Sequence, residues 1–248
     1  MLACSASAVQ AVLVQSWLPG SPALAILHSE IMPGHGESDL FLSIEEEDRL
    51  DSQQHAQTTL HSRSIMVKLS AGAVIAIEDG GFGDRVCVDL TSILEIGEGL
   101  LIGSPANALA LIHGETMESE FVPPRPFRVN AGAVHAYVLM ADGSTKYLSE
   151  LTAGDAVSVC NSSGIARSAV IGRVKIESRP FLIVRFRHPE SGIHGQTFLQ
   201  QAETVRFISP TGEMPSVTSI TVGDLLLARI GASARHIGQT VLSVAEER

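Results

Sequence analysis

Residues 143–155 read GSTKYLSELTAGD, and residues 212–224, which lie 69 positions later, read GEMPSVTSITVGD. Both copies end in Gly-Asp, and an apolar run follows each of them. Glycine allows the backbone to make a tight turn that leads the chain into a strand. The pattern therefore predicts two small barrel-like repeats, near residues 143–177 and 212–244, with the Gly-Asp pairs serving as turns rather than as ligands.

The chain around these copies has the same character from Ile65 onward, where short apolar runs alternate with turn signals. Closely spaced runs of this kind are typical of antiparallel β structure. We expect a mainly β (α+β) fold in which a short amino-terminal helical segment precedes an antiparallel β-rich region. The expected strands are residues 67–77, 85–90, 100–112, 134–140, 156–159, 169–176, 181–186, 204–208, 225–230 and 240–244.

Residues 1–64 differ from the rest. Residues 6–16 form an apolar stretch that predicts a short helix, and Pro19 follows it. Residues 28–64 are polar and acidic, which is typical of a solvated linker. We therefore expect an amino-terminal segment over residues 1–64 and a β-rich domain over residues 65–248.

The composition limits the class of protein. Of 248 residues, 45% are hydrophobic but only 4% are aromatic, so the expected core is aliphatic. The net charge is −10, with −13 in residues 1–120 and +3 in residues 121–248. This distribution argues against nucleic-acid binding but permits a local cationic pocket for a small anion.

The sequence also bears on location. No apolar stretch is long enough to cross a bilayer, and the three cysteines are too widely spaced to form a disulfide framework. A cytoplasmic protein without membrane contact is expected, with an organelle address left open.

The segment RPFRVNAGAVHAY, residues 125–137, concentrates reactive side chains. Arg125 and Arg128 can clamp a carboxylate or a phosphate. His135 and Tyr137 share one face if residues 134–140 form a strand. The alternative is that Arg128 pairs with a structural acid and that His135 is a core histidine, and both interpretations stay open.

Two further clusters are candidates. His113 and Glu115, with Asp89, could bind a divalent metal, although the flanking ligands of a specific metal signature are missing. Alternation places Lys175 on one strand face with Arg173 and Glu177, where it serves either as a phosphate contact or proton donor or as part of a solvated surface.

Several of these stretches resemble the 3-dehydroquinate synthase II family, from about Val67 to the carboxyl terminus. The similarity is carried by GDRVCVD at residues 83–89, GEGLLIGS at 97–104, RPFRVNAGxVHAY at 125–137, KYLSEL at 146–151, VIGRVKIE at 170–177 and QxAET at 200–204.

This resemblance implies an enzyme of aromatic amino acid biosynthesis, in the shikimate pathway. Family members use NAD to oxidise the amine carbon of a seven-carbon 2-amino-6-keto acid. The imine then hydrolyses, ammonia leaves, and an intramolecular aldol reaction gives 3-dehydroquinate. The resemblance implies catalytic roles for His135, Glu115, Lys175 and Tyr137, and binding of the anionic substrate by Arg125, Arg128, Asn130 and Lys146.

The amino-terminal region departs from the family. Relatives carry a further half ahead of the strand that corresponds to Val67, whereas only 66 residues precede it here. We expect a shortened homologue, either in a homo-oligomer or with a partner that supplies the missing half. The alternatives are a non-catalytic β-barrel homologue that binds a partner or small anion, and an aminohydroxybenzoate synthase-like cyclase with a divalent metal.

Overall fold

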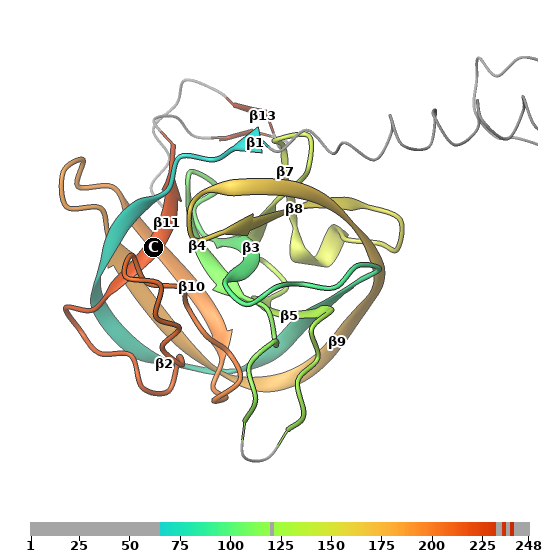
Figure 1. Ribbon diagram of the computed structural model, residues 1–248. Coiled ribbons are helices and arrows are strands. Elements are labelled where there is room, and N and C mark those ends of the chain that lie inside the picture. The colour runs from blue at the N-terminus through green and yellow to red at the C-terminus, as the bar shows by residue number, and fades with distance from the viewer. Residues whose placement is uncertain (1–64, 120–121, 232–234, 237–238, 241–248) are drawn as a thin grey trace, which may run out of the picture. The chain divides into compact units, whose positions relative to one another are not determined.

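The computed structural model describes residues 65–119, 122–231, 235–236 and 239–240. In these residues the chain is mainly β, with antiparallel strand pairs and a single short 3-10 helix (Figure 1). The predicted antiparallel β-rich region is confirmed. The expected helix at residues 6–16 and the acidic linker lie outside the described residues.

Two long strands, β2 (Ser70–Leu90) and β9 (Ile165–Arg187), organise the fold and pair with each other along most of their length. The sequence predicted each of them as two shorter strands, which is wrong. Gly80 and Gly81 do not end β2 but form an irregularity in the pairing, because Gly81 takes a φ of 66°. Each long strand thereby pairs with different neighbours along its two halves, β2 with β11 and β5, and β9 with β8 and β10.

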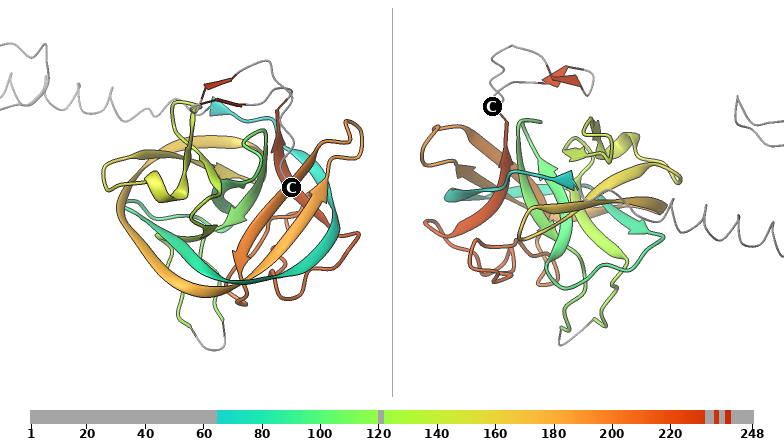
Figure 2. Two further views of the ribbon diagram at one scale, coloured as in Figure 1. Left: turned by 180° about the vertical axis from the view of Figure 1, so that it is seen from behind. Right: turned by 45° about the horizontal axis from the view of Figure 1, so that its top comes forward.

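The strand pairings close on themselves. The order β9–β2–β11–β4–β3–β8 returns to β9, so the central strands form a ring without a free edge (Figures 1 and 2). Strand β5 lies beside β2, and β10 lies beside β9. The remaining bounds are β1 Ile65–Met66, β3 Glu98–Gly103, β4 Ala108–His113, β5 Arg128–Ala133, β6 Tyr137–Leu139, β7 Thr145–Tyr147, η1 Leu148–Glu150, β8 Ala156–Asn161, β10 His194–Gln200, β11 Leu225–Ile230, β12 Arg235–His236 and β13 Gln239–Thr240.

Three further expected strands differ from the structure. The run over residues 100–112 is a hairpin of β3 and β4, because the chain turns where the N–H of Ala108 donates to the Pro105 carbonyl at 2.9 Å. The run over residues 204–208 makes only isolated bridges, and the run over 134–140 contributes only the three residues of β6. Apolar content alone does not separate a strand from a turn or a bridge.

The two sequence copies form matching turns. In the first, the N–H and hydroxyl of Thr152 both donate to the Asp155 carboxylate, at 2.9 and 3.3 Å. In the second, Thr221 makes the same two bonds to Asp224, at 2.7 and 3.0 Å. The glycine before each aspartate has a positive φ, 95° and 100°. The chain then enters β8, which pairs with β9, or β11, which pairs with β2.

The core is aliphatic, as the low aromatic content predicts. The main cluster consists mostly of valine, leucine, isoleucine and alanine side chains from the strands and the segments between them, and Phe186 and Phe207 are its largest members. No helix in the described part of the chain is long and apolar enough to cross a membrane.

Candidate anion-binding site

Three neighbouring strands, β5, β2 and β9, present a polar face. Side chains alternate along β2, so Arg85, Cys87 and Asp89 share this face while Val86 and Val88 enter the core. The residues opposite them are also mostly polar. Asp89 lies opposite Arg128 and Arg173, Cys87 lies opposite Asn130 and Lys175, and Arg85 lies opposite Glu177.

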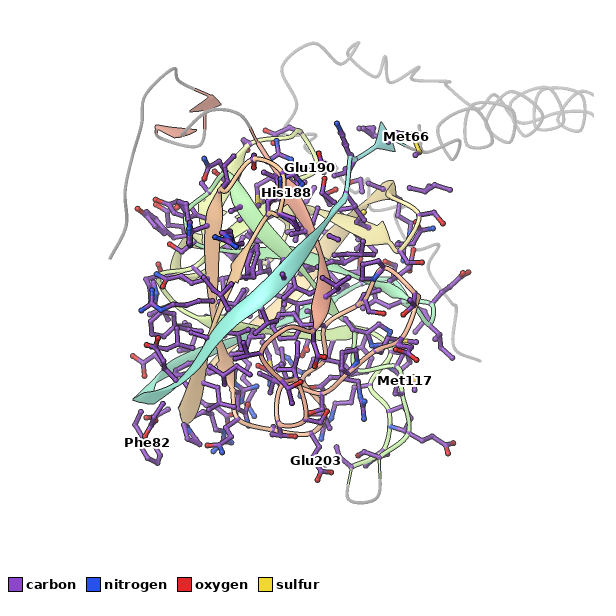
Figure 3. The ribbon with its side chains drawn as sticks, turned by 90° about the vertical axis from the view of Figure 1, so that its left-hand side faces the viewer. Met66, Phe82, Met117, His188, Glu190 and Glu203 are labelled. Carbon is purple, nitrogen blue, oxygen red and sulfur yellow. The ribbon has the colours of Figure 1, made fainter. Side chains whose placement is uncertain are left out.

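A cavity of about 460 Å³ lies over this face. The loops that follow β4 and β10 also contribute to its wall, and Figure 3 shows Met117 and Glu203, one from each loop, at the same end of the molecule. Five cations and three carboxylates line it, which leaves a surplus of two positive charges and favours an anionic ligand. The cations are Arg85, Arg125, Arg128, Lys175 and Arg179, and the carboxylates are Glu115, Glu177 and Glu203.

Asp89 anchors one end of the cavity. Arg128 donates to both of its carboxylate oxygens, at 2.6 and 2.9 Å, and Arg173 donates to Oδ2 at 2.5 and 2.8 Å. Burial opposes ionisation of Asp89, but the hydrogen bonds from Arg128 and Arg173 outweigh it and hold the pKa of the carboxyl below its usual value. Arg128 therefore pairs with a structural acid and also lines the cavity.

Glu177 anchors the other end. Its carboxylate contacts the side-chain nitrogens of Arg85, Lys175 and Arg179 at 2.6, 2.9 and 3.1 Å. The hydrogen bond from Lys175 is the main reason that the pKa of Glu177 lies below its usual value. Arg85 is buried, and its Nε has no hydrogen-bond partner among the described residues.

Glu115 belongs to the loop that covers the Asp89 end. Its buried carboxylate contacts Arg125 at 3.2 Å, and its N–H donates to the Arg128 carbonyl at 2.8 Å. Asn130 is also buried, and its Nδ2 donates to Gln200 at 2.9 Å. The Oδ1 atom of Asn130 has no partner within the described part of the chain.

The structure thus brings together five of the eight residues to which the resemblance gave roles: Glu115, Lys175, Arg125, Arg128 and Asn130. His135, Tyr137 and Lys146 do not line the cavity. The reason is that the chain turns after β5, where the N–H of Ala136 donates to the Ala133 carbonyl at 2.9 Å. The residues after that turn belong to another part of the sheet.

These three side chains have other contacts. The exposed His135 ring meets the edge of Phe198, with 4.7 Å between the ring centres. Tyr137 stacks on Tyr147 and donates its hydroxyl to the Tyr147 hydroxyl at 2.6 Å. Lys146 Nζ contacts the Asp155 carboxylate at 2.7 Å.

The three metal candidates do not form a ligand cluster. Arginines occupy both oxygens of Asp89, and Glu115 pairs with Arg125. His113 is buried, and its Nε2 accepts the N–H of Gly97 at 3.0 Å. Burial, with a smaller contribution from nearby Arg206, lowers the pKa of His113 to about 4. Within the described residues, no three histidine, cysteine, aspartate or glutamate side chains come together as a metal site.

Sequence reasoning assigned no site role to nine of the fourteen lining residues, which include Arg85, Glu177, Arg179, Gln200 and Glu203. Arg85, Glu177 and Gln200 lie in the stretches GDRVCVD, VIGRVKIE and QxAET that carry the family resemblance. That resemblance was the available signal for these residues. Spacing along the chain could not show that Arg85 and Glu177 meet, because they are 92 positions apart.

Comparison with known proteins places the chain among relatives. Residues 71–248 match the family described as the 3-dehydroquinate synthase II C-terminal domain. The 3-dehydroquinate synthase of Methanosphaera stadtmanae is 49% identical over 173 residues, which cover 70% of this chain and 48% of that protein. Those of Methanothermobacter thermautotrophicus and Methanocaldococcus jannaschii are 48% and 47% identical, over 70% and 71% of this chain and 46% and 48% of theirs. The chain spans about half the length of the curated relatives it matches.

Proposed function

The chain belongs to the 3-dehydroquinate synthase II family, and from this we propose that its cationic cavity serves the conversion of a seven-carbon 2-amino-6-keto acid to 3-dehydroquinate. The observation that supports the proposal is the surplus of positive charge in a cavity of about 460 Å³. Arginine binds carboxylates with paired hydrogen bonds, and substrate and product each carry one carboxylate.

The residues that line the cavity suit the ring-closing step. Arg125 and Arg128 hold the substrate carboxylate at the Asp89 end. After oxidation and hydrolysis have replaced the amine at position 2 by a carbonyl and released ammonia, Glu115 takes a proton from carbon 7, beside the 6-keto group, and carbon 7 attacks the carbonyl carbon at position 2. Lys175 gives a proton to the alkoxide that forms when the carbon–carbon bond closes. Glu115 and Lys175 both line the cavity, so a single bound substrate can reach both groups.

The resemblance also implies NAD, and the described residues do not form a dinucleotide site on their own. Val122 and Ala202 are the only apolar side chains among the fourteen residues that line the cavity, so the wall offers little surface to a nicotinamide or adenine ring. The described residues include no α-helix whose amino terminus could receive a diphosphate. The oxidation step is thus proposed on the family resemblance alone.

Incubation of the chain with NAD and the amino-keto acid tests the proposal, with NADH, ammonia and 3-dehydroquinate as readouts. Replacement of Arg128 by Gln is expected to reduce ring formation about a hundredfold, because the substrate carboxylate loses its main partner. The fold should persist, since Asp89 keeps Arg173. Arg185→Gln is the matched control, because Arg185 does not line the cavity and should leave activity unchanged.

A second candidate function is an anion-binding module without catalysis. It is favoured by the position of His135, Tyr137 and Lys146 outside the cavity. Titration with 3-dehydroquinate separates the two candidates. Binding that weakens in Arg128→Gln, without turnover by the folded wild-type chain, supports the module. Absence of both binding and turnover contradicts both candidates.

A further inference from the structure

The cavity has two cationic ends, and the proposed function places the substrate carboxylate at only one of them, although it takes a proton from Lys175 of the other end. The Asp89 end holds Arg125 and Arg128, whereas the Glu177 end holds Arg85, Lys175 and Arg179. We propose that Arg85, Lys175 and Arg179 form a second anion subsite, which takes a phosphoryl group. This inference goes beyond the proposed function, because it assigns the cavity a second ligand group of different charge.

The two ends are separate positions along the same strands. Arg85 and Asp89 are four residues apart on β2, which corresponds to about 13 Å. Arg179 lies opposite Gly83, still farther from Asp89. A carboxylate held by Arg128 therefore does not satisfy the donors around Glu177, and each end can hold an anion of its own.

The Glu177 end has donors to spare. Arg85 is 94% buried, it lines the cavity, and its Nε has no acceptor among the described residues. Lys175 and Arg179 each have further N–H groups beyond the bonds that they make to Glu177. The Lys175 and Arg179 side chains are 46% and 43% exposed, so an incoming anion can accept hydrogen bonds from these remaining N–H groups.

The balance of charge selects the kind of anion. Three cations and one carboxylate leave the Glu177 end with two positive charges. A phosphoryl dianion neutralises them, whereas a single carboxylate does not. At the Asp89 end, the lining residues Arg125, Arg128 and Glu115 leave one positive charge, which suits a monocarboxylate. Asp89 and Arg173 pair with each other outside the lining and cancel. Glu203 reduces the surplus of the whole lining to two.

Glu177 holds the three cations of the subsite together when no anion is bound. Its carboxylate lies within ion-pair distance of all three cations, which would otherwise repel one another. The hydrogen bond from Lys175 lowers the pKa of this carboxyl and so favours its charged form. Glu177 is therefore a positioning residue, and its negative charge works against the anion that the subsite binds.

Titration of the chain with inorganic phosphate, followed by phosphorus NMR, tests the subsite. Arg179→Gln and Lys175→Gln are each expected to weaken phosphate binding about tenfold, through loss of a charged hydrogen bond. Glu177→Gln is expected to tighten it, an effect that a purely structural role would not produce. The control is Arg185→Gln, on the same strand but outside the cavity, which should leave binding unchanged.

Several outcomes would overturn the subsite. They are an absence of phosphate binding by the wild-type chain, equal binding by Arg179→Gln and wild type, and weaker binding by Glu177→Gln when its unfolding transition is unchanged. Because 43% of the Arg179 side chain is exposed, Arg179→Gln tests the subsite without disturbing the core.

A titration with two ligands separates this proposal from the proposed function. With 3-dehydroquinate saturating, phosphate should still bind, and displacement of phosphate would mean that there is only one anion site. Loss of 3-dehydroquinate binding alone counts against the proposed function and not against the subsite. Ribose 5-phosphate and NAD, used as competitors of phosphate, then distinguish a phosphorylated small molecule from a dinucleotide as the source of the phosphoryl group.

Discussion

Two three-stranded faces of the sheet, β5–β2–β9 and β2–β9–β10, have the same arrangement but different side chains. In the first, β2 lies in the middle and presents Arg85, Cys87 and Asp89. In the second, β9 lies in the middle and presents Ile183 and Arg185 beside the glutamate Glu78 of β2. Both faces contain ion pairs, but only the first lies under the cavity.

The two faces differ in the burial of their carboxylates, Asp89 and Glu78. The Asp89 side chain is 6% exposed, whereas those of Arg185 and Glu78 are 35% and 48% exposed. Exposed ion pairs contribute little to stability, because water screens them. A buried carboxylate needs its cations, because removal of one partner leaves an uncompensated charge in a poorly solvated place. Similar strand pairing thus yields a binding site where buried carboxylates hold cations beside a cavity and an ordinary surface where the carboxylate is exposed.

The largest expected effect on stability is on the β5–β2–β9 face, which lies under the cavity. Asp89→Asn should lower the free energy of unfolding by about 3–5 kcal/mol, since Arg128 and Arg173 lose the charge that compensates both of them. Urea denaturation at neutral pH measures the change. A loss below about 1 kcal/mol would mean that the two faces are energetically alike.

The second effect is a pH dependence of the free energy of unfolding, which comes from His113, near the loop that carries Glu115. His113 precedes the loop of Glu115, and its pKa is lowered from 6.5 to about 4. The unfolded chain therefore binds a proton in this range more readily than the folded chain. Stability should fall by roughly 3 kcal/mol as the pH drops from about 6.5 to about 4.

The variant His113→Gln isolates this contribution, because Gln keeps an acceptor for the Gly97 N–H but does not titrate. Urea midpoints at several pH values should depend less on pH in the variant than in the wild type. Equal slopes for both proteins would show that other groups carry the pH dependence.

The smallest effect on stability is expected on the β2–β9–β10 face, which carries Glu78 and Arg185. Glu78→Gln and Arg185→Gln should each change the free energy of unfolding by less than about 0.5 kcal/mol, because the pair at 3.1 Å is largely solvated. The double variant measures their coupling. A coupling comparable to the loss in Asp89→Asn would remove the distinction between the faces.

Some features of the fold follow from local sequence patterns, and others do not. Alternation on β2 places Val86 and Val88 in the core and leaves Arg85 and Asp89 on the other face, and glycine marks the turns predicted at Gly154 and Gly223. Each of these signals depends only on neighbouring residues. The same reasoning failed at Gly81, because the pairing of β2 with a distant strand carries the chain through the irregularity.

The candidate site also combines features that neighbouring residues determine with features that distant parts of the chain determine. Arg125, Arg128, Asn130, Glu115 and Lys175 could be named from the sequence, chiefly because they lie in or near stretches that resemble one family. The proximity of His135 and Tyr137 to Arg128 in the sequence was misleading, because a single turn after β5 separates them in space. Proximity in the sequence therefore does not by itself place side chains in one site.

Composition, alternation and turn residues were sufficient for a mainly β chain with an aliphatic core, because each acts over a few residues. The ion pairs Asp89–Arg173 and Arg85–Glu177 join positions 84 and 92 residues apart. Their formation depends on the register between β2 and β9, and a shift of one residue would turn every charged side chain of a strand to the opposite face. Register is a property of the assembled sheet, and for this reason the cavity and its charges emerge only in the folded protein.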